Sequence, residues 1–288
     1  MEKVTLVATD LDGTLLTGNK KVTEKTRKAI QDLKNRGIIF GIASGRPVES
    51  TLILSKDWGL DEDVSFLIGM NGGTIYDVRK EEKEEYYLMK GETILKIIHH
   101  FQDMNVLFHI LVGNHRYTNH SIEETRAHAK LFGEIETEVD LEQFLLGKKI
   151  NKLIIYLMDP NDMDAVKERA KSLISSEFTS FQTAPNLYEY VDPNINKGFG
   201  IKKVCEHFGV DIKNVVAFGD AGNDKEMLEV VGMGVAMKNA TDDVKEVADY
   251  ISEYTNEEDA LGYFVENHIL ENNPDALDKD ANLRKKGV

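Results

Sequence analysis

The chain has 288 residues, of which 41% are hydrophobic and 30% are charged, and its formal net charge is −15 at pH 7. These values are ordinary for a globular protein with a substantial core, and the length favours two domains. The negative charge argues against non-specific binding to nucleic acid or to anionic membranes, so an anionic ligand needs local cations. Because the sequence has no apolar stretch of about 20 residues and no signal-peptide layout, we expect a cytoplasmic protein.

The segment Val4–Leu15 reads VTLVATDLDGTL, an apolar run that ends in Asp10 and Asp12 and is followed by Gly13. The apolar run predicts a buried strand. Residues i and i+2 of an extended chain point the same way, so both carboxylates can face one small volume. Such a pair repels itself unless a cation lies between the carboxylates or one of them keeps a proton. The segment predicts a divalent-metal site or an acid/base pair, although Asp-Gly is also a favoured hairpin turn.

The residues after Gly13 argue against a hairpin. The segment Thr23–Arg36 carries apolar and small residues at helical spacing and stops before Gly37, which predicts a helix. The apolar run Ile38–Ala43 then predicts a second strand, parallel to the first. Open α/β sheets bind their ligands beyond the carboxyl ends of their strands, and both aspartates lie at such an end.

Apolar runs separated by helical patterns predict a buried parallel sheet in both terminal parts of the chain. These runs end at Thr9, Ala43, Gly69, Phe218 and Met237. We therefore expect an α/β core domain at residues 1–82 and 192–271, and a polar tail at 272–288.

The middle of the chain has a different organisation. We predict helices at Glu92–Asp103, Ile122–Phe132 and Ala165–Ile174, and strands at Val106–Val112, Leu153–Met158, Thr179–Thr183 and Leu187–Val191. Most of these strands lack a helical crossover, which favours a separate α+β domain with an antiparallel sheet, inserted at residues 83–191.

Two further segments carry anion-binding chemistry. Ser44 and Gly45 close the second strand ahead of a predicted helix, where free backbone N–H groups and a hydroxyl form a small anion site. Simple N-capping by Ser44 is the alternative. Lys197 stands at the front of another helix, where a cation opposes the helix dipole at a cost of roughly a few tenths of a kcal/mol. An anion held between Lys197 and a metal would explain this position, and a solvated surface lysine is the alternative.

The sequence VVAFGDAGNDKEM places three polar residues, Asp220, Asn223 and Asp224, directly after another buried strand. Asn223 could cap the following helix, with Glu226 completing a capping box. That interpretation leaves Asp220 and Asp224 unexplained. With oxygen donors and no cluster of cysteine and histidine, Mg²⁺ is the expected ion.

The four segments together resemble the haloacid dehalogenase superfamily of phosphohydrolases, through DLDGTL at Asp10–Leu15, Ser44, Lys197 and GDAGND at Gly219–Asp224. The insert, MNGG at Met70–Gly73 and MKNAT at Met237–Thr241 resemble the Cof-like branch, with its type IIB cap. The resemblance implies a Rossmann-like parallel-sheet core with an inserted α+β cap domain. It also implies a Mg²⁺-dependent phosphatase for small phosphorylated metabolites, namely sugar phosphates, nucleotides or cofactor phosphates. We expect no nucleic-acid or membrane partner, and a monomer or homodimer.

Carried over residue by residue, the resemblance implies that Asp10 is the nucleophile and a metal ligand. It implies that Asp12 is the general acid/base and offers its backbone carbonyl to the metal, with Asp220 and Asp224 completing the metal site. It assigns phosphate or substrate contacts to Leu11, Ser44, Gly45, Lys197 and Asn223. Attack by Asp10 forms an aspartyl phosphate, which divides one difficult displacement into two easier ones. The aspartate at position 12 favours a hydrolase or mutase over the family's ATP-driven pumps, which carry threonine there.

Three other functions are compatible with parts of this sequence. A phosphomannomutase-like phosphotransferase shares this kind of core and cap. A phosphate-binding regulatory module of the receiver type also combines acidic strand ends with a lysine, but it carries its phospho-accepting aspartate on a middle strand and no large insert. A dinucleotide-binding enzyme is disfavoured because neither GxGxxG nor GxxxxGK[ST] occurs.

Several single residues are weaker candidates. The candidates for substrate contacts from the insert are His109, His115, Arg116 and His120. Isolated polar residues on strands and loops are, however, mostly solvated. Asn71 either contacts substrate or shapes a turn. Cys205, the only cysteine, lies in a helical pattern and is expected to be a buried apolar residue and not a nucleophile.

Overall fold

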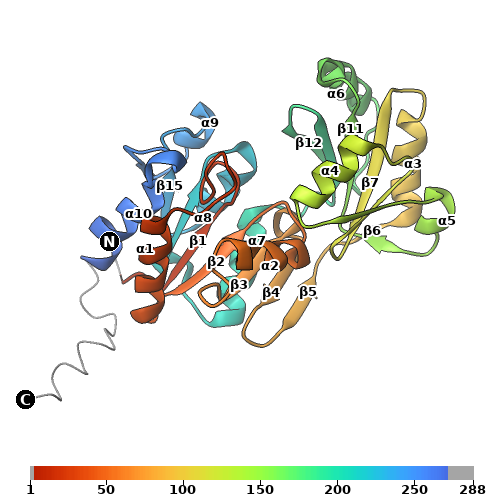
Figure 1. Cartoon of the computed structure of the whole chain (residues 1–288). Coiled ribbons are helices and arrows are strands. Elements are labelled where there is room, and N and C mark those ends of the chain that lie inside the picture. Colours follow the sequence, from red (N-terminus) through yellow and green to blue (C-terminus); the bar gives the residue numbers. More distant parts are fainter. Residues whose placement is uncertain (1–2, 272–288) are drawn as a thin grey trace, which may run out of the picture. The chain divides into compact units, whose positions relative to one another are not determined.

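The structure, a computed structural model, describes residues 3–271 (Figure 1). Contacts divide the chain into two compact units. Within the described residues, unit 1 comprises residues 3–45, 55–83 and 196–271, and unit 2 comprises residues 46–54 and 84–195. Among these residues, none of the helices has the length and apolarity needed to cross a membrane.

Unit 1 is built on an eight-stranded sheet with the order β16-β15-β14-β1-β2-β3-β4-β5. All neighbours from β16 to β3 pair in parallel, and β4 pairs antiparallel with β3. The strands are β1 (Leu6–Thr9), β2 (Ile39–Ala43), β3 (Phe66–Gly69), β4 (Thr74–Asp77), β5 (Glu82–Glu85), β14 (Val215–Gly219), β15 (Met233–Ala236) and β16 (Tyr250–Ile251). The central strands are buried on both faces, which explains their continuous apolar sequences.

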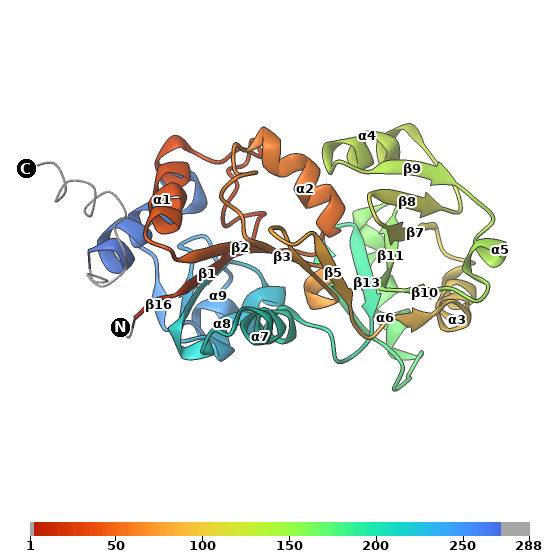
Figure 2. The ribbon, with the colours of Figure 1, turned by 90° about the horizontal axis from the view of Figure 1, so that it is seen from below.

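Helices cover both faces of this sheet, with α1 on one face and α7 and α8 on the other (Figure 2). The longer helices are α1 (Glu24–Asn35) and α7 (Lys197–Phe208), and the shorter ones are α8 (Lys225–Val230), α9 (Asp242–Lys245), α10 (Ala260–Phe264) and the π-helical η6 (Val265–Leu270). Helix α2 (Val48–Asp57) lies mostly within residues 46–54, which belong to unit 2. Four 3₁₀ turns are η1 (Met70–Gly72), η3 (Ile212–Asn214), η4 (Gly222–Asp224) and η5 (Asn256–Glu258). Helix α1 begins after Thr23, whose side chain accepts from the Thr26 backbone, and α7 ends at the left-handed Gly209.

Unit 2 holds a six-stranded sheet with the order β12-β13-β11-β7-β8-β9 and a separate pair, β10 and β6. The strands are β6 (Met89–Lys90), β7 (Val106–Val112), β8 (His115–Thr118), β9 (Ile135–Glu138), β10 (Lys149–Ile150), β11 (Lys152–Leu157), β12 (Thr179–Ala184) and β13 (Leu187–Val191). The helices are α3 (Gly91–Phe101), α4 (Glu123–Leu131), α5 (Leu141–Leu145) and α6 (Met163–Lys171), with the 3₁₀ turn η2 (Pro160–Asp162). Apolar residues of α3, α5 and α6 pack against one face of the large sheet.

The predicted α/β class, with a mostly parallel main sheet and a second α+β sheet, is confirmed. The sheet of unit 2 is mixed, however, where the sequence predicts an antiparallel one. Helix α4 is a crossover between β8 and β9, and a crossover places the second strand parallel to the first. Strands β8 and β9 and helix α5 are too short to show a clear period in the sequence. The predicted domain boundaries stay predictions, and the predicted tail at 272–288 lies outside the described residues.

The hairpin alternative for the first aspartates is wrong. Around Gly13 the chain forms an isolated β-bridge between Asp12 and Leu16, and it then continues into α1. Strand β1 pairs in parallel with β2 on one side and with β14 on the other. The chain therefore departs from the sheet at Asp10, between two neighbouring strands that run the same way.

Candidate active site

Polar residues follow four adjacent strands of the main sheet, β14, β1, β2 and β3. Asp10 follows β1, Ser44 follows β2, Asn71 lies in the turn after β3, and Asp220 follows β14. Because these strands are parallel, their carboxyl ends lie at one edge of the sheet. The sheet order thus brings together segments that are up to 210 residues apart in the chain, from Asp10 to Asp220.

Three carboxylates form a cluster at this edge. Asp10, Asp220 and Asp224 each offer an oxygen, and these oxygens all lie within 4.8 Å of one another. Asp10 is 7% exposed and Asp224 is fully buried. Burial raises the pKa of Asp220 to about 6, and the Thr14 hydroxyl, which donates to it, opposes this rise. The donor set suits a hard divalent cation, which prefers carboxylate oxygens.

Lys197 is fully buried and lies among these carboxylates. Its Nζ is 2.5 Å from Asp10 Oδ1 and 2.5 Å from Asp224 Oδ1. Burial alone would lower the pKa of this lysine, but the two carboxylates raise it overall. Burial raises the pKa of Asp10 well above its ordinary value, while Lys197 opposes this effect. The solvated-lysine alternative is therefore wrong, and Lys197 keeps its charge inside the core.

The charges of this cluster leave room for a cation. Three ionised carboxylates and one ammonium sum to −2, in a place where solvent screens little. A divalent cation held by Asp10, Asp220 and Asp224 would neutralise that sum. The residues present therefore fit a divalent metal.

The loop after β14 is fixed by Asp224. One of its carboxylate oxygens accepts from the backbone N–H groups of Asp220 and Ala221, both at 3.0 Å. Asn223 donates from Nδ2 to Asn71 Oδ1 at 3.1 Å. The alternative of a capping box formed by Asn223 and Glu226 is therefore wrong. Asn223 lies inside η4, and α8 begins after Asp224.

Asp12 differs from Asp10 in its surroundings. Its side chain is 37% exposed, and its carboxylate accepts from Lys20 Nζ at 2.6 Å. It is not one of the three clustered carboxylates. The two aspartates of the opening motif thus occupy unlike environments, one buried against Lys197 and one half exposed beside Lys20.

Ser44, Gly45 and Leu11 lie close to these residues in the fold. Ser44 is 3% exposed, and its backbone N–H donates to Ile68 O at 2.8 Å. The sequence predicts that this N–H is free to bind an anion, and the structure shows that it is not. A Cβ on Gly45 would lie 3.0 Å from Asn71 Oδ1. Leu11 is fully buried, and its carbonyl accepts from Leu16 N at 2.8 Å.

Three residues that we did not single out in the sequence support the site. Thr14 donates to Asp220 Oδ1 at 2.7 Å, Lys20 pairs with Asp12, and Asn239 Nδ2 donates to the carbonyl of Gly13 at 2.8 Å. Gly13 has φ +90°, and a Cβ there would lie 2.3 Å from Asp220 Oδ2. Gly13 and Thr14 lie inside the DLDGTL motif, which is the one sequence signal for their role. Their partner, Asp220, is 206 residues from Thr14, so the sequence does not show the contact.

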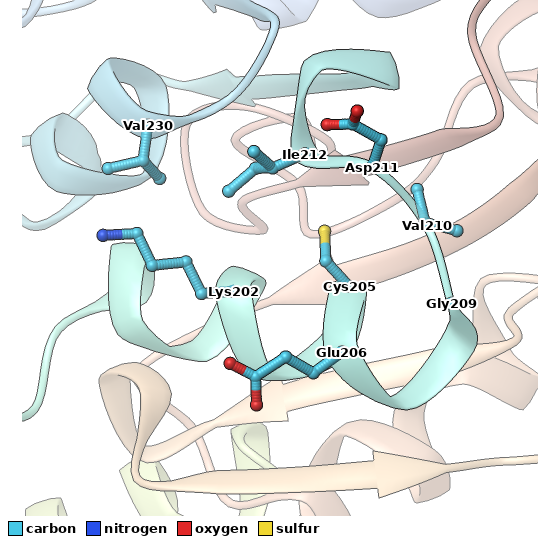
Figure 3. A pocket seen from close by; sticks show the side chains of 8 residues that line it. All are labelled: Lys202, Cys205, Glu206, Gly209, Val210, Asp211, Ile212 and Val230. Atoms are coloured by element: carbon cyan, nitrogen blue, oxygen red, sulfur yellow. The ribbon is translucent and has the colours of Figure 1, made fainter.

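The single cysteine is not part of this site. Cys205 is 5% exposed on α7, and its sulfur lines a separate pocket of about 850 Å³ with Lys202, Val210 and Ile212 (Figure 3). Burial raises the pKa of its thiol to about 11. The expected burial of this cysteine is confirmed.

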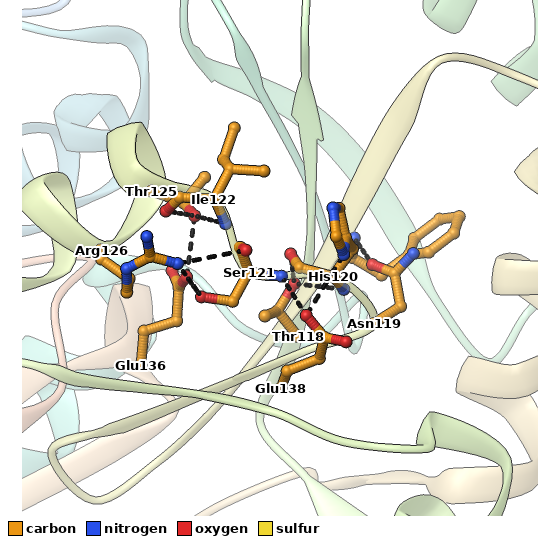
Figure 4. Close-up of polar contacts among 10 residues, drawn as sticks. Thr118, Asn119, His120, Ser121, Ile122, Thr125, Arg126, Glu136 and Glu138 are labelled. Atoms are coloured by element: carbon orange, nitrogen blue, oxygen red, sulfur yellow. Dashed lines mark hydrogen bonds and ion pairs between the residues drawn. The ribbon is translucent and has the colours of Figure 1, made fainter.

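The candidate residues of unit 2 separate into buried and exposed groups. His109 is 1% exposed and Arg116 is 4% exposed, against the expectation that such residues are solvated. Arg116 forms a buried ion pair with Glu134. His120 is exposed and pairs with Glu138, beside a network that includes Ser121 (Figure 4). His115 is half-buried and stacks on Tyr117.

Comparisons with known proteins agree with this site. A family model described as haloacid dehalogenase-like hydrolase matches residues 7–265. The chain is 30% identical to the 5-amino-6-(5-phospho-D-ribitylamino)uracil phosphatase YcsE of Bacillus subtilis, over 93% of this chain and 96% of the relative. It is 28% identical to the phosphatase YitU of the same organism, named for the same compound, over 92% of this chain and 97% of the relative.

A solved structure supports the same assignment. A haloacid dehalogenase-like hydrolase from Bacteroides thetaiotaomicron superposes with a TM-score of 0.82 at 27% identity, over 92% of this chain and 99% of the other. The match of the family model across most of the chain includes every strand end that carries a site residue. The chain therefore belongs to the haloacid dehalogenase-like hydrolases, in their Cof-like branch, and is a phosphoric monoester hydrolase.

Proposed function

We propose that this chain is a Mg²⁺-dependent phosphatase that hydrolyses small phosphate monoesters through an aspartyl phosphate on Asp10. The observation that carries this proposal is the contact of Asp10 with Lys197, inside the cluster completed by Asp220 and Asp224. A phosphate monoester dianion repels an anionic nucleophile, so cationic groups must lie beside the nucleophile.

Lys197 and Asp10 have complementary tasks in this mechanism. Asp10 attacks the phosphorus in line with the leaving oxygen, and the ester bond to that oxygen breaks as the new bond to Asp10 forms. Lys197 opposes the rise that burial causes in the pKa of Asp10, which favours the ionised nucleophile, and it offers N–H donors to the phosphoryl oxygens. Asp10, Asp220, Asp224 and the backbone carbonyl of Asp12 would hold Mg²⁺, which would supply positive charge to neutralise the transferred group.

Asp12 is the general acid/base of the proposal. Asp12 must take up a proton before the ester bond breaks; it then gives this proton to the leaving alkoxide and later takes a proton from the water that attacks the aspartyl phosphate. Its exposed side chain suits a group that must reach both the leaving group and water. The Lys20 ammonium holds this carboxylate in place before substrate arrives.

Phosphate contacts are proposed for Leu11, Ser44, Gly45 and Asn223. Ser44 has its backbone N–H engaged, so its contribution is the hydroxyl. Asn223 contributes its carboxamide, oriented by Asn71.

We infer that unit 2 acts as the cap that selects the leaving group. The substrate class is a sugar phosphate, a nucleotide or a cofactor phosphate. The names of YcsE and YitU make 5-amino-6-(5-phospho-D-ribitylamino)uracil one compound for a substrate panel. A cytoplasmic location and a monomeric or homodimeric state complete the proposal.

The test is hydrolysis of a generic aryl phosphate, followed by a panel of sugar phosphates, nucleotides and cofactor phosphates. Phosphate release with Mg²⁺ that EDTA abolishes supports the proposal. Turnover that needs an added sugar bisphosphate would instead favour a phosphomannomutase-like transferase. Equal turnover with Mg²⁺ and with EDTA would contradict the proposed metal dependence.

A further inference from the structure

The turn after β3 has an unusual backbone. Met70 and Asn71 have φ values of +52° and +56°, and Gly72 follows with φ +108°. Three consecutive residues are thus left-handed, and two of them carry a Cβ that makes this conformation costly. Both side chains are buried, with Met70 4% and Asn71 2% exposed. Such strain persists only where the surrounding structure imposes it, and it concentrates at functional sites.

The turn contacts three segments of the proposed phosphoryl site. The Asn71 backbone N–H donates to the Ser44 carbonyl at 3.1 Å, and the Asn71 Oδ1 accepts from Asn223 Nδ2 at 3.1 Å. The same oxygen approaches Gly45 so closely that a Cβ there would lie 3.0 Å from it. Asn71 thus contacts the loop after β2 through its backbone N–H and the loop after β14 through its side chain, and β1 lies between the two strands that precede these loops.

The third segment is the start of α7. Gly72 leaves so little room that a Cβ there would lie 2.1 Å from the Asn196 carbonyl. Asn196 caps α7 through its side chain, which accepts from Phe199 N at 2.8 Å, and Lys197 is the first residue of that helix. The left-handed turn therefore packs directly against the residue that precedes Lys197.

We propose that Asn71 is a positioning residue for the phosphoryl site, which holds Ser44, Gly45 and Asn223 in fixed relative positions. The inference rests on the proposed function, because these three residues matter only if they bind phosphate. Asn71 does not itself touch substrate in this account, since its carboxamide is buried and engaged with Asn223. Its effect passes through the groups that it orients.

A glycine substitution at position 71 tests the effect of the side chain separately from the effect of the backbone conformation. Asn71→Gly accepts the left-handed turn without strain but removes the carboxamide. We expect the dissociation constant for inorganic phosphate, measured by calorimetry with Mg²⁺, and the KM for an aryl phosphate to rise about ten-fold, the equivalent of one buried hydrogen bond. We expect kcat to change by less than about three-fold, because Asp10, Asp12 and Lys197 stay in place. Asn71→Ala, which keeps a Cβ at the strained position, should weaken phosphate binding equally and lower Tm further.

Asp259→Gly is the matched control in unit 1. Asp259 is also a left-handed residue, with φ +63°, and its carboxylate accepts from Thr23 and Thr26. This substitution also removes side-chain hydrogen bonds at a left-handed residue, but at a position away from the phosphoryl site. It should lower Tm while the phosphate dissociation constant stays that of the unaltered protein. An equal weakening of phosphate binding by Asp259→Gly would show a general effect of destabilisation and would overturn the inference.

A double-mutant cycle with Asn223→Ala completes the test. If Asn71 acts through Asn223, the Asn71→Gly/Asn223→Ala variant should weaken phosphate binding by less than the product of the two single effects. Independent, multiplicative effects, or an unchanged phosphate dissociation constant in Asn71→Gly, would overturn the positioning role alone. Absence of phosphatase activity in the unaltered protein would instead count against the proposed function, and calorimetry distinguishes the two failures because it needs no turnover.

Discussion

The ammonium of Lys197 lies 2.5 Å from the carboxylate of Asp224, and neither side chain is exposed to solvent. A buried ion pair is stable only when its hydrogen-bonding capacity is satisfied. Here Asp224 also accepts from two backbone N–H groups, and Lys197 also donates to Asp10. The pair joins the start of α7 to the loop after β14 and holds a cation beside the proposed nucleophile.

Removal of this lysine should affect both stability and activity. Lys197→Met leaves the buried carboxylates of Asp10 and Asp224 without their cation, so we expect a loss of about 3–5 kcal/mol in the free energy of unfolding. Turnover should fall below detection. The control is Lys203→Met on the same helix, because Lys203 is partly exposed and pairs with the more exposed Glu206, so its loss should cost less than about 0.5 kcal/mol. Equal unfolding curves for the two variants, from chemical denaturation, would contradict the account of Lys197.

Thr14 should matter for metal affinity. Its hydroxyl donates to Asp220 and orients that carboxylate, and the loss of such an outer partner commonly weakens metal binding 10- to 100-fold, so we expect roughly a ten-fold weaker Mg²⁺ affinity in Thr14→Val. The measurement is the dependence of Tm on Mg²⁺ concentration, which reports binding without turnover. Thr17→Val, which loses only an exposed hydroxyl contact with Lys21, serves as the control. Identical Mg²⁺ dependence in both variants would show that Thr14 does not support a metal ligand.

The sequence predicts which segments carry the candidate residues but not the contacts between those residues. The candidate aspartates, Ser44 and Asn223 follow apolar runs, and parallel strands bring such positions to one edge of a sheet. Local patterns could not show that Lys197 is buried, because its partners Asp10 and Asp224 lie 187 and 27 residues away. They also allowed capping by Asn223, whose side chain donates instead to Asn71, 152 residues away.

His109 should make the stability of the protein depend on pH. Burial holds its pKa well below the ordinary value, with Arg116 and His128 contributing in the same direction, and its Nε2 has no hydrogen-bond partner. The folded protein keeps this ring neutral, while the unfolded chain binds a proton below about pH 6.5. Stability is therefore present above that pH and is lost as pH falls.

Between pH 7.5 and 5.5 the contribution of His109 amounts to about 1.4 kcal/mol, if its folded pKa lies below this range. His109→Phe and His109→Gln should therefore each show a smaller loss of unfolding free energy across this interval than the unaltered protein. Urea denaturation at the two pH values measures the difference. A loss in both variants equal to that of the unaltered protein would exclude a buried neutral histidine.

Unit 2 was harder to predict than unit 1 for a physical reason. Strand β8 and the edge strand β9 have four residues each, and β9 is largely exposed, so neither shows a continuous apolar run. Polar residues were expected at the surface, yet Arg116 is buried against Glu134. A buried charge is tolerated when it is paired, and the sequence does not reveal the pairing.

The central claim is a covalent phosphoryl group on Asp10, and the most direct measurement is the intact mass of Asp12→Asn after brief exposure to an aryl phosphate with Mg²⁺. Without the acid/base residue the intermediate should form slowly and persist, so the mass should increase by one phosphoryl group. The increase should map to the peptide that contains Asp10 and be absent from the Asp10→Asn/Asp12→Asn variant. Normal turnover by Asp12→Asn would contradict its acid/base role, and undiminished turnover by Asp10→Asn would contradict the assignment of the nucleophile.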